Sequence, residues 1–302
     1  MMSSVEAIGD GDGVADLAAV DRARLQATAF RLLGTRADAE DAVQEAYARY
    51  YRLDPVERAA VRNPAGWLTT VVGRVCLDVL GSARARRERY VGPWLPEPLP
   101  GSPTSSAPVD PAERVTLDDE VTSALMVVLE TLTPAERVAF VLHDVFGLSF
   151  REVADVVGRT PEACRTLASA ARRDLRERRV RDASPEGHDR VVRGFALACA
   201  TGDLAALLPL LDPDVTLRSD GGGVVSAARN PVHGADRVAR FLLGLLTKDP
   251  SLEPSLEPVE GRTGVVLRSA GSVVAVATFH VVSDVVEDVW IVVNPEKLTA
   301  WS

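Results

Sequence analysis

The sequence has few cysteines, and their spacing suits neither a metal site nor a disulfide framework. The three cysteines are Cys76, Cys164 and Cys199, and no Cys-x-x-Cys or Cys/His ligand pattern surrounds them. A zinc site needs ligands at such short spacings, and disulfides are rare in reducing compartments. Because each cysteine falls within an apolar helical pattern, we interpret all three as small residues of helix packing and expect no metal.

Long apolar runs are also lacking. No uninterrupted apolar segment approaches the roughly 20 residues that a membrane-spanning helix needs. The N-terminal segment MMSSVEAIGDGDGVAD is acidic and contains nothing like the apolar core of a signal peptide. We therefore expect a cytoplasmic protein with no membrane partner.

The chain lacks an overall positive charge, since its net charge is −9. Phosphate contacts, however, come from local clusters of arginine and lysine and not from the total charge. Arginines outnumber acidic residues in two segments, Arg74–Arg89 and Arg159–Arg181. This distribution favours a protein that a partner delivers to DNA over one that coats DNA.

Two composition breaks divide the 302 residues into three units. The first break is a proline-rich segment, residues 93–112, which we expect to run as an extended, semi-rigid connector because proline cannot continue a helix or a central strand. The second is the turn-forming segment Arg181–Gly187. The predicted units are a helical unit at 15–92, a helical unit at 113–182 and a unit of mixed type at 188–302.

The stretch from Ser149 to Arg173 has the pattern of a helix-turn-helix. Gly158 can adopt the left-handed backbone of the turn without strain, Thr160 suits an N-cap, and Pro161 suits the first position of a helix. The residues expected to face the core are Phe150, Val153, Ala154, Val157, Ala163, Leu167, Ala170 and Ala171. In this motif the second helix lies in the DNA major groove. Its candidate DNA-binding residues are Thr160, Glu162, Arg165, Thr166, Ser169, Arg172 and Arg173.

The first unit shows three further helical patterns. Apolar residues from Leu25 to Leu33 repeat at helical spacing and stop at Gly34. The next helix buries Val43, Ala46, Tyr47 and Tyr50, and an acidic face is left outside. A third helix begins near Pro64, and its expected core stripe is Leu68, Val71, Val72, Val75 and Val79. Thr69, Thr70, Arg74 and Asp78 project from its other side, followed by Arg84, Arg86, Arg87 and Arg89.

Together these segments resemble a known family. The segments DAEDAVQEAY, NPAGWLTTVVGRVCLD and LTPAERVAFVLHDVFGLSFREVADVVGRTPEACRTLASAARRDL occur in the order typical of a bacterial extracytoplasmic-function sigma factor. Such a factor consists of two all-α domains, the region 2 helical bundle and the region 4 helix-turn-helix. The resemblance covers residues 20–180 and implies that the protein binds core RNA polymerase and selects promoters, needs no cofactor and is not an enzyme.

The resemblance also implies roles for individual residues. An acidic and amide face suits a basic partner helix, so this face would dock on the coiled-coil clamp helices of the polymerase β′ subunit, with the β flap as a further contact. Its residues are Asp38, Glu40, Asp41, Gln44 and Glu45. The projecting residues of the third helix, with Arg84, Arg86 and Arg87, would hold the −10 element as single-stranded DNA. The helix that starts at Thr160 would read the −35 element in duplex form.

The third unit is predicted to be an α+β cone. It begins with a helix that contains Val191 and Phe195 and ends at Gly202, continues with a helical stretch Asp203–Leu211, and has a helix through Val238 and Leu246. Strand-like runs follow at 264–267, 272–282 and 285–293. This unit resembles the SnoaL-like (cystatin/ketosteroid-isomerase-like) domain that extends one sigma-factor subgroup, the one that includes the mycobacterial J-type factor.

Three short motifs support that subgroup and would form regulatory contacts between the domains. They are Trp94-Leu95-Pro96 with the following Glu-Pro, the loop Asp220-Gly221-Gly222-Gly223, and the tail Asn294-Pro295-Glu296-Lys297-Leu298. The loop of the subgroup ends in a basic residue where this chain has Val224, which puts a charge-based role of that position in doubt. In the subgroup, the extension is thought to regulate the sigma factor from within.

Other functions fit parts of the chain. Catalysis in the third unit would need a carboxylate or histidine in an apolar pocket with an oxyanion donor. The available residues are His188, His233, His280, Asp284 and Asp288. Their spacing does not indicate a catalytic pair. A small-molecule ligand of the cone is a further possibility. A ligand-gated helix-turn-helix regulator explains residues 149–302 but gives residues 20–92 no role.

Overall fold

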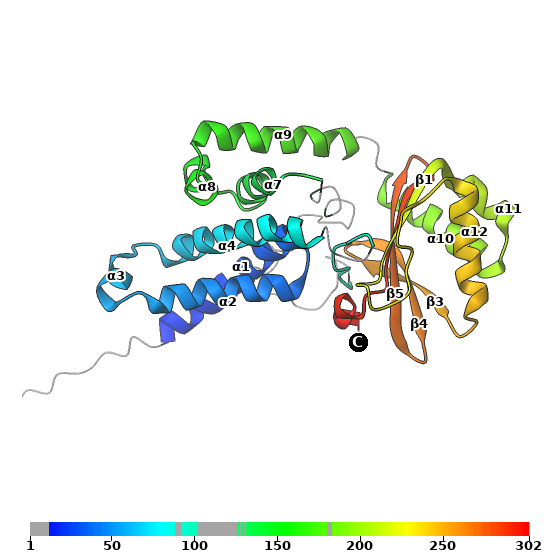
Figure 1. Cartoon of the computed structure of the whole chain (residues 1–302), viewed down its shortest axis with the longest axis horizontal. Helices are drawn as coiled ribbons and strands as arrows, with labels where there is room; N and C mark the ends of the chain where they lie inside the picture. Colours follow the sequence, from blue (N-terminus) through cyan, green and yellow to red (C-terminus); the bar gives the residue numbers. More distant parts are fainter. Residues whose placement is uncertain are drawn as a thin grey trace, which may run out of the picture.

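The computed structural model describes residues 12–87, 92–101, 126, 129, 131–179 and 183–301, with side chains described for 22–82, 92–101, 126, 129, 131–175 and 183–301. The described residues form a lobe of helices and an α+β lobe (Figure 1). The described part of the linker and the C-terminal turns, η3 (Pro295–Lys297) and η4 (Thr299–Trp301), lie between the two lobes.

The first helical unit is built from four helices whose ends are set by local sequence. They are α1 (Asp12–Leu33), α2 (Arg36–Arg52), α3 (Pro55–Ala60) and α4 (Pro64–Arg87). Thr35 caps α2 by accepting from the Asp38 amide, and Asp54 forms a capping box with Glu57 at the start of α3. Leu32, Val43 and Val72 are fully buried between α1, α2 and α4, as the sequence pattern predicts.

The second helical unit contains the predicted helix-turn-helix. Its elements are α7 (Pro134–Phe140), the π-helical turn η1 (Val141–Val145), α8 (Phe150–Val157) and α9 (Pro161–Arg179). Ser149 and Glu152 form a capping box at the start of α8, and Gly158 ends α8 in the left-handed conformation with φ of 70°. Thr160 accepts from the Ala163 amide, as an N-cap does.

The predicted inward faces of the helix-turn-helix need correction. In α8, Val153, Ala154 and Val156 are buried, whereas Phe150 and Val157 are only partly buried. In α9, Ala171 is buried as expected, but the other buried residues are Cys164, Ala168 and Leu175, and the predicted Ala163, Leu167 and Ala170 are only half-buried. The burial of Val156 has a specific cause, which is a contact with the other helical unit.

The two helical units share one hydrophobic core. Helix α4 packs against both α7 and α8, and the buried cluster runs continuously from Leu25 to Ala171. Gly73 lies at a close approach of α4 to α8 and η1, since a Cβ atom there would lie 2.8 Å from Val156 Cγ1 and 3.2 Å from Leu142 Cδ1. Glycine within a helix costs about 1 kcal/mol relative to alanine, so a helical glycine at this position indicates that close packing is the native arrangement.

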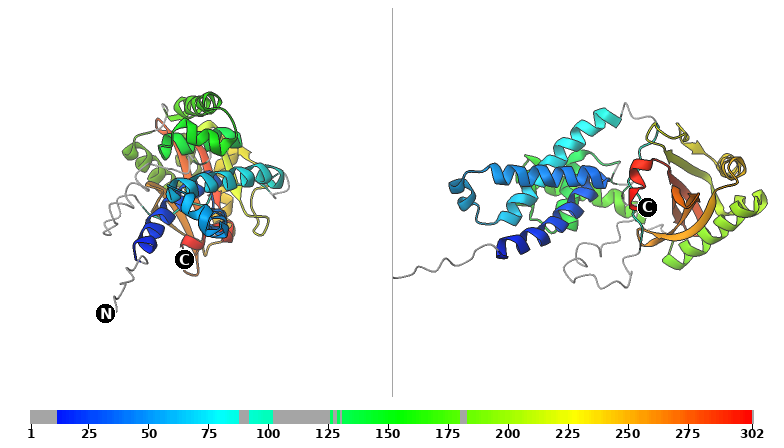
Figure 2. Two further views of the ribbon diagram at one scale, coloured as in Figure 1. Left: turned by 90° about the vertical axis from the view of Figure 1, so that its left-hand side faces the viewer. Right: turned by 90° about the horizontal axis from the view of Figure 1, so that it is seen from below.

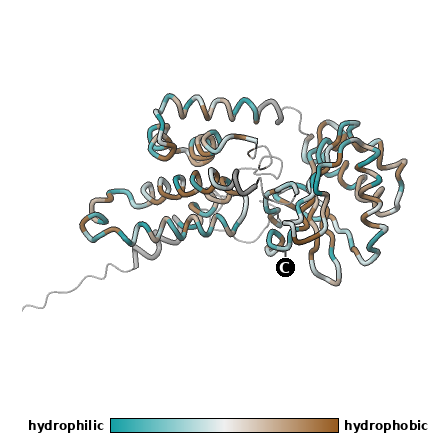
Figure 3. The backbone as a smooth tube through the Cα atoms, in the orientation of Figure 1, coloured by the Kyte–Doolittle hydropathy of each residue, from teal (hydrophilic) through white to brown (hydrophobic). Residues whose placement is uncertain are grey.

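The α+β lobe is a curled six-stranded sheet with helices on one face. The strand order is β2-β1-β6-β5-β4-β3, with β1 and β6 parallel and the other pairs antiparallel. Helices α10 and α12 lie on the face turned away from the helical lobe, and apolar residues follow the strands and the helices that cover them (Figures 2 and 3). The bounds are α10 Pro185–Thr201, α11 Leu204–Leu207, η2 Leu208–Leu210, β1 Leu211–Asp220, β2 Val232–His233, α12 Ala235–Lys248, β3 Glu253–Val259, β4 Arg262–Ser269, β5 Ser272–Val282 and β6 Val285–Val292.

The predicted α+β cone is confirmed, but β1, the two-residue β2 and β3 are absent from the sequence prediction. Strand β3 contains Pro254 and Pro258, and proline disfavours a strand except at an edge, where β3 indeed lies. Strand β1 begins at Leu211, so the predicted helical stretch Asp203–Leu211 is too long and ends with η2. Pairing with β6 holds β1 extended, and no local pattern reveals that distant partner.

Replacing Gly73 tests the shared core. We expect Gly73→Val to cost about 1–3 kcal/mol of stability, because overpacking forces α4 and α8 apart. The matched control is Gly81→Ala in the same helix, where a Cβ atom has no neighbour within 4 Å. Thermal unfolding and small-angle X-ray scattering measure both effects. An unchanged scattering radius together with unchanged stability in Gly73→Val would contradict the shared core.

Candidate nucleic-acid interface and interdomain linker

The acidic face of α2 is exposed. Asp38, Glu40, Asp41 and Gln44 are exposed and Glu45 is half-buried, while Ala39, Ala42, Val43 and Ala46 face the core. Glu45 accepts a hydrogen bond from Arg49 at 2.8 Å and also pairs with Arg52 at 3.4 Å. These contacts lower the pKa of the Glu45 carboxyl, so it remains ionised at neutral pH. The face therefore presents negative charge to a partner.

The projecting side of α4 faces the second helical unit and is partly covered by it. Thr69 and Thr70 are half-buried, and their hydroxyls donate to the carbonyls of Ala65 and Gly66. The Arg74 guanidinium donates twice to the Asp155 carbonyl of α8, at 3.2 and 2.8 Å. Asp78 is exposed. The side chains of Arg84, Arg86 and Arg87 lie outside the described residues.

The outer face of α9 is open to solvent. Its exposed residues are Thr160, Glu162, Arg165, Thr166, Ser169 and Arg173. Arg172 is less free, because its guanidinium forms an ion pair with Asp144 of η1 at 2.5 Å. The Arg165 guanidinium lies over the Phe150 ring, 5.2 Å from its centroid. One candidate DNA-binding face is thus exposed and the other is held against its neighbour.

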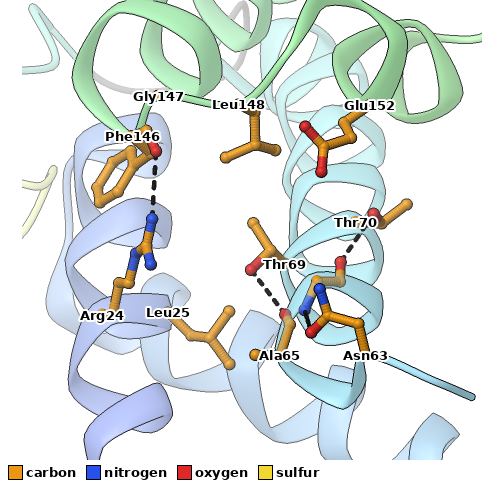
Figure 4. A pocket seen from close by; sticks show the side chains of 11 residues that line it. Arg24, Leu25, Asn63, Ala65, Thr69, Thr70, Phe146, Gly147, Leu148 and Glu152 are labelled. Atoms are coloured by element: carbon orange, nitrogen blue, oxygen red, sulfur yellow. Dashed lines mark hydrogen bonds between the residues drawn. The ribbon is translucent and has the colours of Figure 1, made fainter.

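A pocket of about 230 Å³ lies between the two helical units (Figure 4). Arg24 of α1 and the start of α4 form one wall, and Phe146 to Leu148 with Glu152 form the other. Arg24 donates to the Phe146 carbonyl at 3.2 Å and so spans the pocket. The role of Arg24 is not predictable from the sequence, because a lone arginine in an amphipathic helix is typical of a solvated face.

Two more arginines at this junction, which unlike Arg24 are buried, were not predicted from the sequence. Arg137 is buried, and its guanidinium donates to the carbonyls of Leu129 and of Leu32 near the end of α1. Burial lowers the pKa of Arg137 to about 9, which leaves it charged at neutral pH. Arg31 is buried with its guanidinium 5.4 Å from the centre of the Phe146 ring. The sequence signal was the position of Arg137 among apolar residues at helical spacing.

The linker docks first on the helical lobe. The Trp94 ring covers Gly34, where φ is 80° and where a Cβ atom would lie 2.6 Å from the ring. The Glu97 amide donates to the Gly34 carbonyl, and the Glu97 carboxylate accepts from the Arg36 amide at 2.8 Å. Burial raises the pKa of the Glu97 carboxyl, although its contact with Arg36 opposes the shift. The extended linker is therefore anchored at the turn between α1 and α2.

The same linker is bound to the α+β lobe by a buried ion pair. Asp220 and Lys297 are 0 % and 5 % exposed, and Lys297 Nζ lies 2.7 Å from Asp220 Oδ2. The Leu95 amide donates to that same carboxylate oxygen at 2.9 Å, and Lys297 Nζ donates to the Leu95 carbonyl at 2.5 Å. Lys297 Nζ also lies 4.1 Å from the centre of the Trp94 ring, within the range of a cation–π contact.

The glycines of the Asp220 loop are required by close approaches. A Cβ atom at Gly221 would lie 2.4 Å from the Val225 carbonyl oxygen, and one at Gly222 would lie 2.7 Å from the Asn294 side chain. The Gly222 amide donates to Asp220 Oδ1, which orients the carboxylate toward Leu95 and Lys297. The structure thus brings the three predicted interdomain motifs together, with Pro96 and Leu298 also buried at this junction. Pro295 and Glu296 are exposed beside it.

Further contacts hold the chain on both sides of the second helical unit. Before it, the linker pairs with the β3–β4 turn through the Pro100–Val259 bridge, and Trp301 Nε1 donates to the Pro98 carbonyl. After it, the Ala183 amide donates to the Val281 carbonyl of β5, and Arg262 donates to the Ala183 carbonyl. The α+β lobe therefore binds both the chain segment before α7 and the chain segment after α9.

The candidate catalytic residues do not form one site. His188 is buried, and its Nε2 lies 3.0 Å from the Thr263 carbonyl, as a satisfied core histidine would. His280 Nδ1 lies 3.6 Å from Asp288, whose carboxylate pairs with Arg218. His233 pairs instead with Thr216, and the exposed Asp284 pairs with Arg190. Within the described ranges, no cluster of three His, Cys, Asp or Glu side chains could hold a metal ion. Each helix in those ranges is too short or too polar to cross a membrane.

Comparison with known proteins shows likeness over nearly the whole chain. Residues 20–87 match Sigma-70 region 2, and residues 122–175 match Sigma-70 region 4. The chain is 45% identical over 230 residues to the ECF RNA polymerase sigma factor SigJ of Mycobacterium tuberculosis, covering 75% of this chain and 71% of SigJ. It is 39% identical over 281 residues to the probable ECF RNA polymerase sigma factor SigI of that organism, covering 92% of each. The crystal structure of M. tuberculosis SigJ superposes with a TM-score of 0.71 at 37% identity, covering 95% of this chain and 98% of SigJ.

Replacing Lys297 tests the buried ion pair. We expect Lys297→Met to cost about 3–5 kcal/mol in the unfolding of the α+β lobe, because Asp220 then stays buried without its cation. The surface control is the exposed Lys248→Met. Adding Asp220→Asn should recover part of the loss, since residues in contact are not additive. Urea unfolding measures each variant, and a loss no larger than that of Lys248→Met would show that the pair does not hold the linker.

Proposed function

Because the chain belongs to the extracytoplasmic-function RNA polymerase sigma factors, we propose that its α+β lobe controls when the two DNA-reading domains can reach a promoter. As a sigma factor, the chain binds core RNA polymerase and directs promoter-specific transcription initiation. Region 2 and region 4 are hereafter the helical units α1–α4 and α7–α9. The proposed domain limits are 15–92 for region 2, 93–112 for the linker, 113–182 for region 4 and 188–302 for the SnoaL-like domain.

We assign the polymerase and promoter contacts as follows. The acidic face of α2 docks on the β′ clamp helices, and region 4 meets the β flap. The outer side of α4, with Thr69, Thr70, Arg74 and Asp78, holds the −10 element, together with Arg84, Arg86 and Arg87. The exposed face of α9 reads the −35 element in the major groove. The exposure of the α2 and α9 faces supports two of these assignments, because a docking surface must be accessible.

The packing of region 2 against region 4 is a closed state that cannot engage both promoter elements. The two elements are about 25 positions apart by their names, which is roughly 85 Å at about 3.4 Å per base pair of B-DNA. Domains in direct contact through Gly73 and Val156 cannot reach both sites at once. Region 4 must therefore leave α4 before the chain can act.

The buried Asp220–Lys297 contact with Leu95 is the observation that carries the regulatory proposal. It fixes the chain before region 4, while the Ala183 contacts fix the chain after region 4. Holding both flanking segments limits how far region 4 can move away from region 2, because a tethered segment explores less space. The lobe thus favours the closed state and restrains initiation until polymerase binds.

The other readings of the α+β lobe are less well supported. A ligand-gated regulator would leave the acidic face of α2 without a role, whereas a sigma factor would use such a face to dock on core polymerase. Kinship of fold does not transfer catalysis, and we propose that the chain is not an enzyme. We infer a cytoplasmic location because core RNA polymerase and promoter DNA are found there. A small-molecule ligand of the lobe would act by loosening or tightening the linker contact.

Run-off transcription from genomic fragments with purified core polymerase tests the function. The full chain is compared with a chain that ends at Ser184, the N-cap of α10. We expect promoter-specific transcripts from both, with more product from the shorter chain at equal concentration because region 4 is no longer held. Transcripts from neither chain, with polymerase active alongside a control factor, would contradict the function. Less product from the shorter chain would contradict the restraining role alone.

Charge reversal at Glu45 tests the docking face. Glu45→Lys places a like charge against a basic partner helix, so we expect core polymerase to bind at least about tenfold more weakly, which is about 1.4 kcal/mol. Asp236→Lys is the matched control, because Asp236 also forms an i,i+4 pair with an arginine but lies on the α+β lobe. Surface plasmon resonance with immobilised core polymerase measures both. Equal affinity for the two variants would remove the docking assignment.

A further inference from the structure

The junction between region 2 and region 4 has walls of opposite charge. Arg24 and Arg74 extend from region 2, and both side chains are exposed. Glu152 and Asp155 lie on α8 of region 4, and both are exposed. A phosphodiester group that enters this junction is therefore attracted by one wall and repelled by the other.

The two arginines donate to neutral acceptors that an anion can replace. Each donates to a peptide carbonyl of region 4, Arg24 to Phe146 and Arg74 to Asp155. Neither has a carboxylate partner within salt-bridge distance among the described residues, although Asp155 supplies the carbonyl that Arg74 contacts. An ionised phosphate adds the attraction of a full negative charge, which a peptide carbonyl lacks, and it can accept two hydrogen bonds from one guanidinium in parallel.

The acidic wall stays charged when the junction is closed. The Ser149 hydroxyl and amide both donate to Glu152, which lowers the pKa of the Glu152 carboxyl. Its negative charge is therefore present at neutral pH, where it faces the pocket (Figure 4). A phosphate bound by Arg24 in this pocket would face the Glu152 carboxylate across it, and like charges repel.

The size of the pocket selects the form of the nucleic acid. Its volume of about 230 Å³ is below the range of about 300–1,000 Å³ found for small-molecule sites. It can admit one nucleobase, with the amide of Asn63 and the half-buried Thr69 and Thr70 at its wall. A double helix cannot enter a space of this size.

We propose that single-stranded nucleic acid enters this pocket in the free chain and opens the closed state. Its phosphates take Arg24 from the Phe146 carbonyl at the pocket and repel Glu152. Beyond the pocket lining, one helical turn after Thr70, they take Arg74 from the Asp155 carbonyl and repel the Asp155 carboxylate. This inference rests on the closed state proposed above, and it gives the chain a second opening ligand besides polymerase. Single-stranded DNA then acts on the sigma factor before, or together with, its recognition as a −10 element.

The test uses the full chain without polymerase, so its failure is separate from a failure in transcription. The probe is a fluorescent 12-nucleotide single-stranded DNA, and the control probe has the same bases on an uncharged methylphosphonate backbone. Anisotropy measures binding and small-angle scattering measures opening. We expect the DNA to bind and to increase the radius of gyration, and the uncharged probe to do neither.

Two variants of helix α1 distinguish binding at the pocket from non-specific attraction of the DNA by positive charge. Arg24→Gln removes the pocket arginine, while Arg22→Gln removes an exposed arginine of α1 that lies outside the pocket. Loss of one phosphate contact to a single strand lowers the slope of log Kd against log salt by about 0.7. We expect this change and a roughly tenfold weaker binding in Arg24→Gln, and neither in Arg22→Gln. Gly73→Val, in which we expect α4 and α8 to be forced apart, should bind the DNA more tightly than the unaltered chain.

Several results would overturn the proposal. An unchanged affinity and salt slope in Arg24→Gln would remove the pocket as the binding site. Binding of the DNA with no change in the radius of gyration would show that the strand does not open the junction. Equal binding of the uncharged probe would show that phosphate is not the group recognised, and no binding of the DNA at all would show that the closed chain has no such site.

Discussion

The buried ion pair between Asp220 and Lys297 fixes the path of the linker, and the linker relates the three domains to one another. Removing two charges from water costs more than their attraction returns unless further hydrogen bonds complete the site. Here the amide and carbonyl of Leu95 supply two of those bonds, beside the one from the Gly222 amide, so the linker forms part of the polar shell of the pair. Because the pair contacts the backbone of Leu95, it fixes which linker residue lies at this site. The neighbouring linker residues are then placed as well, with Trp94 over Gly34 and Glu97 beside Arg36.

Close approaches permitted by glycine connect this contact to the closed state. Gly34 admits the Trp94 ring, Gly222 admits the Asn294 side chain, and Gly73 admits Val156 of region 4. Gly73 lies between region 2 and region 4, Gly34 lies between region 2 and the linker, and Gly222 lies within the α+β lobe beside the tail that carries Lys297. A side chain at any of the three would force the touching segments apart. The closed arrangement is therefore encoded by small residues at the contacts as much as by the apolar residues of the shared core. Such contacts have two states, packed and separated, because a close-packed interface cannot be deformed gradually.

Local sequence determined much of this structure. The capping residue Ser149, the turn glycine Gly158 and the apolar stripe of α4 predicted the helix-turn-helix and the region 2 bundle, and the motifs around Trp94, Asp220 and Asn294 predicted an interdomain cluster. The contacts between domains were not predictable. Burial of Val156 depends on Gly73, more than 80 positions away, and strand β1 depends on β6. Arg24 and Arg137 look like ordinary helix residues until the partner carbonyls are known.

The distance between region 2 and region 4 tests the closed state most directly. Dyes can be placed at two exposed positions, Val56→Cys on α3 and Asp174→Cys on α9, in a chain with Cys199→Ser, since Cys76 and Cys164 are buried. Energy transfer between them is compared in the free chain and in the complex with core polymerase on promoter DNA. We predict a single population with efficient transfer in the free chain and a marked fall in transfer in the complex. Equal transfer in the two states would contradict a closed state that opens for initiation.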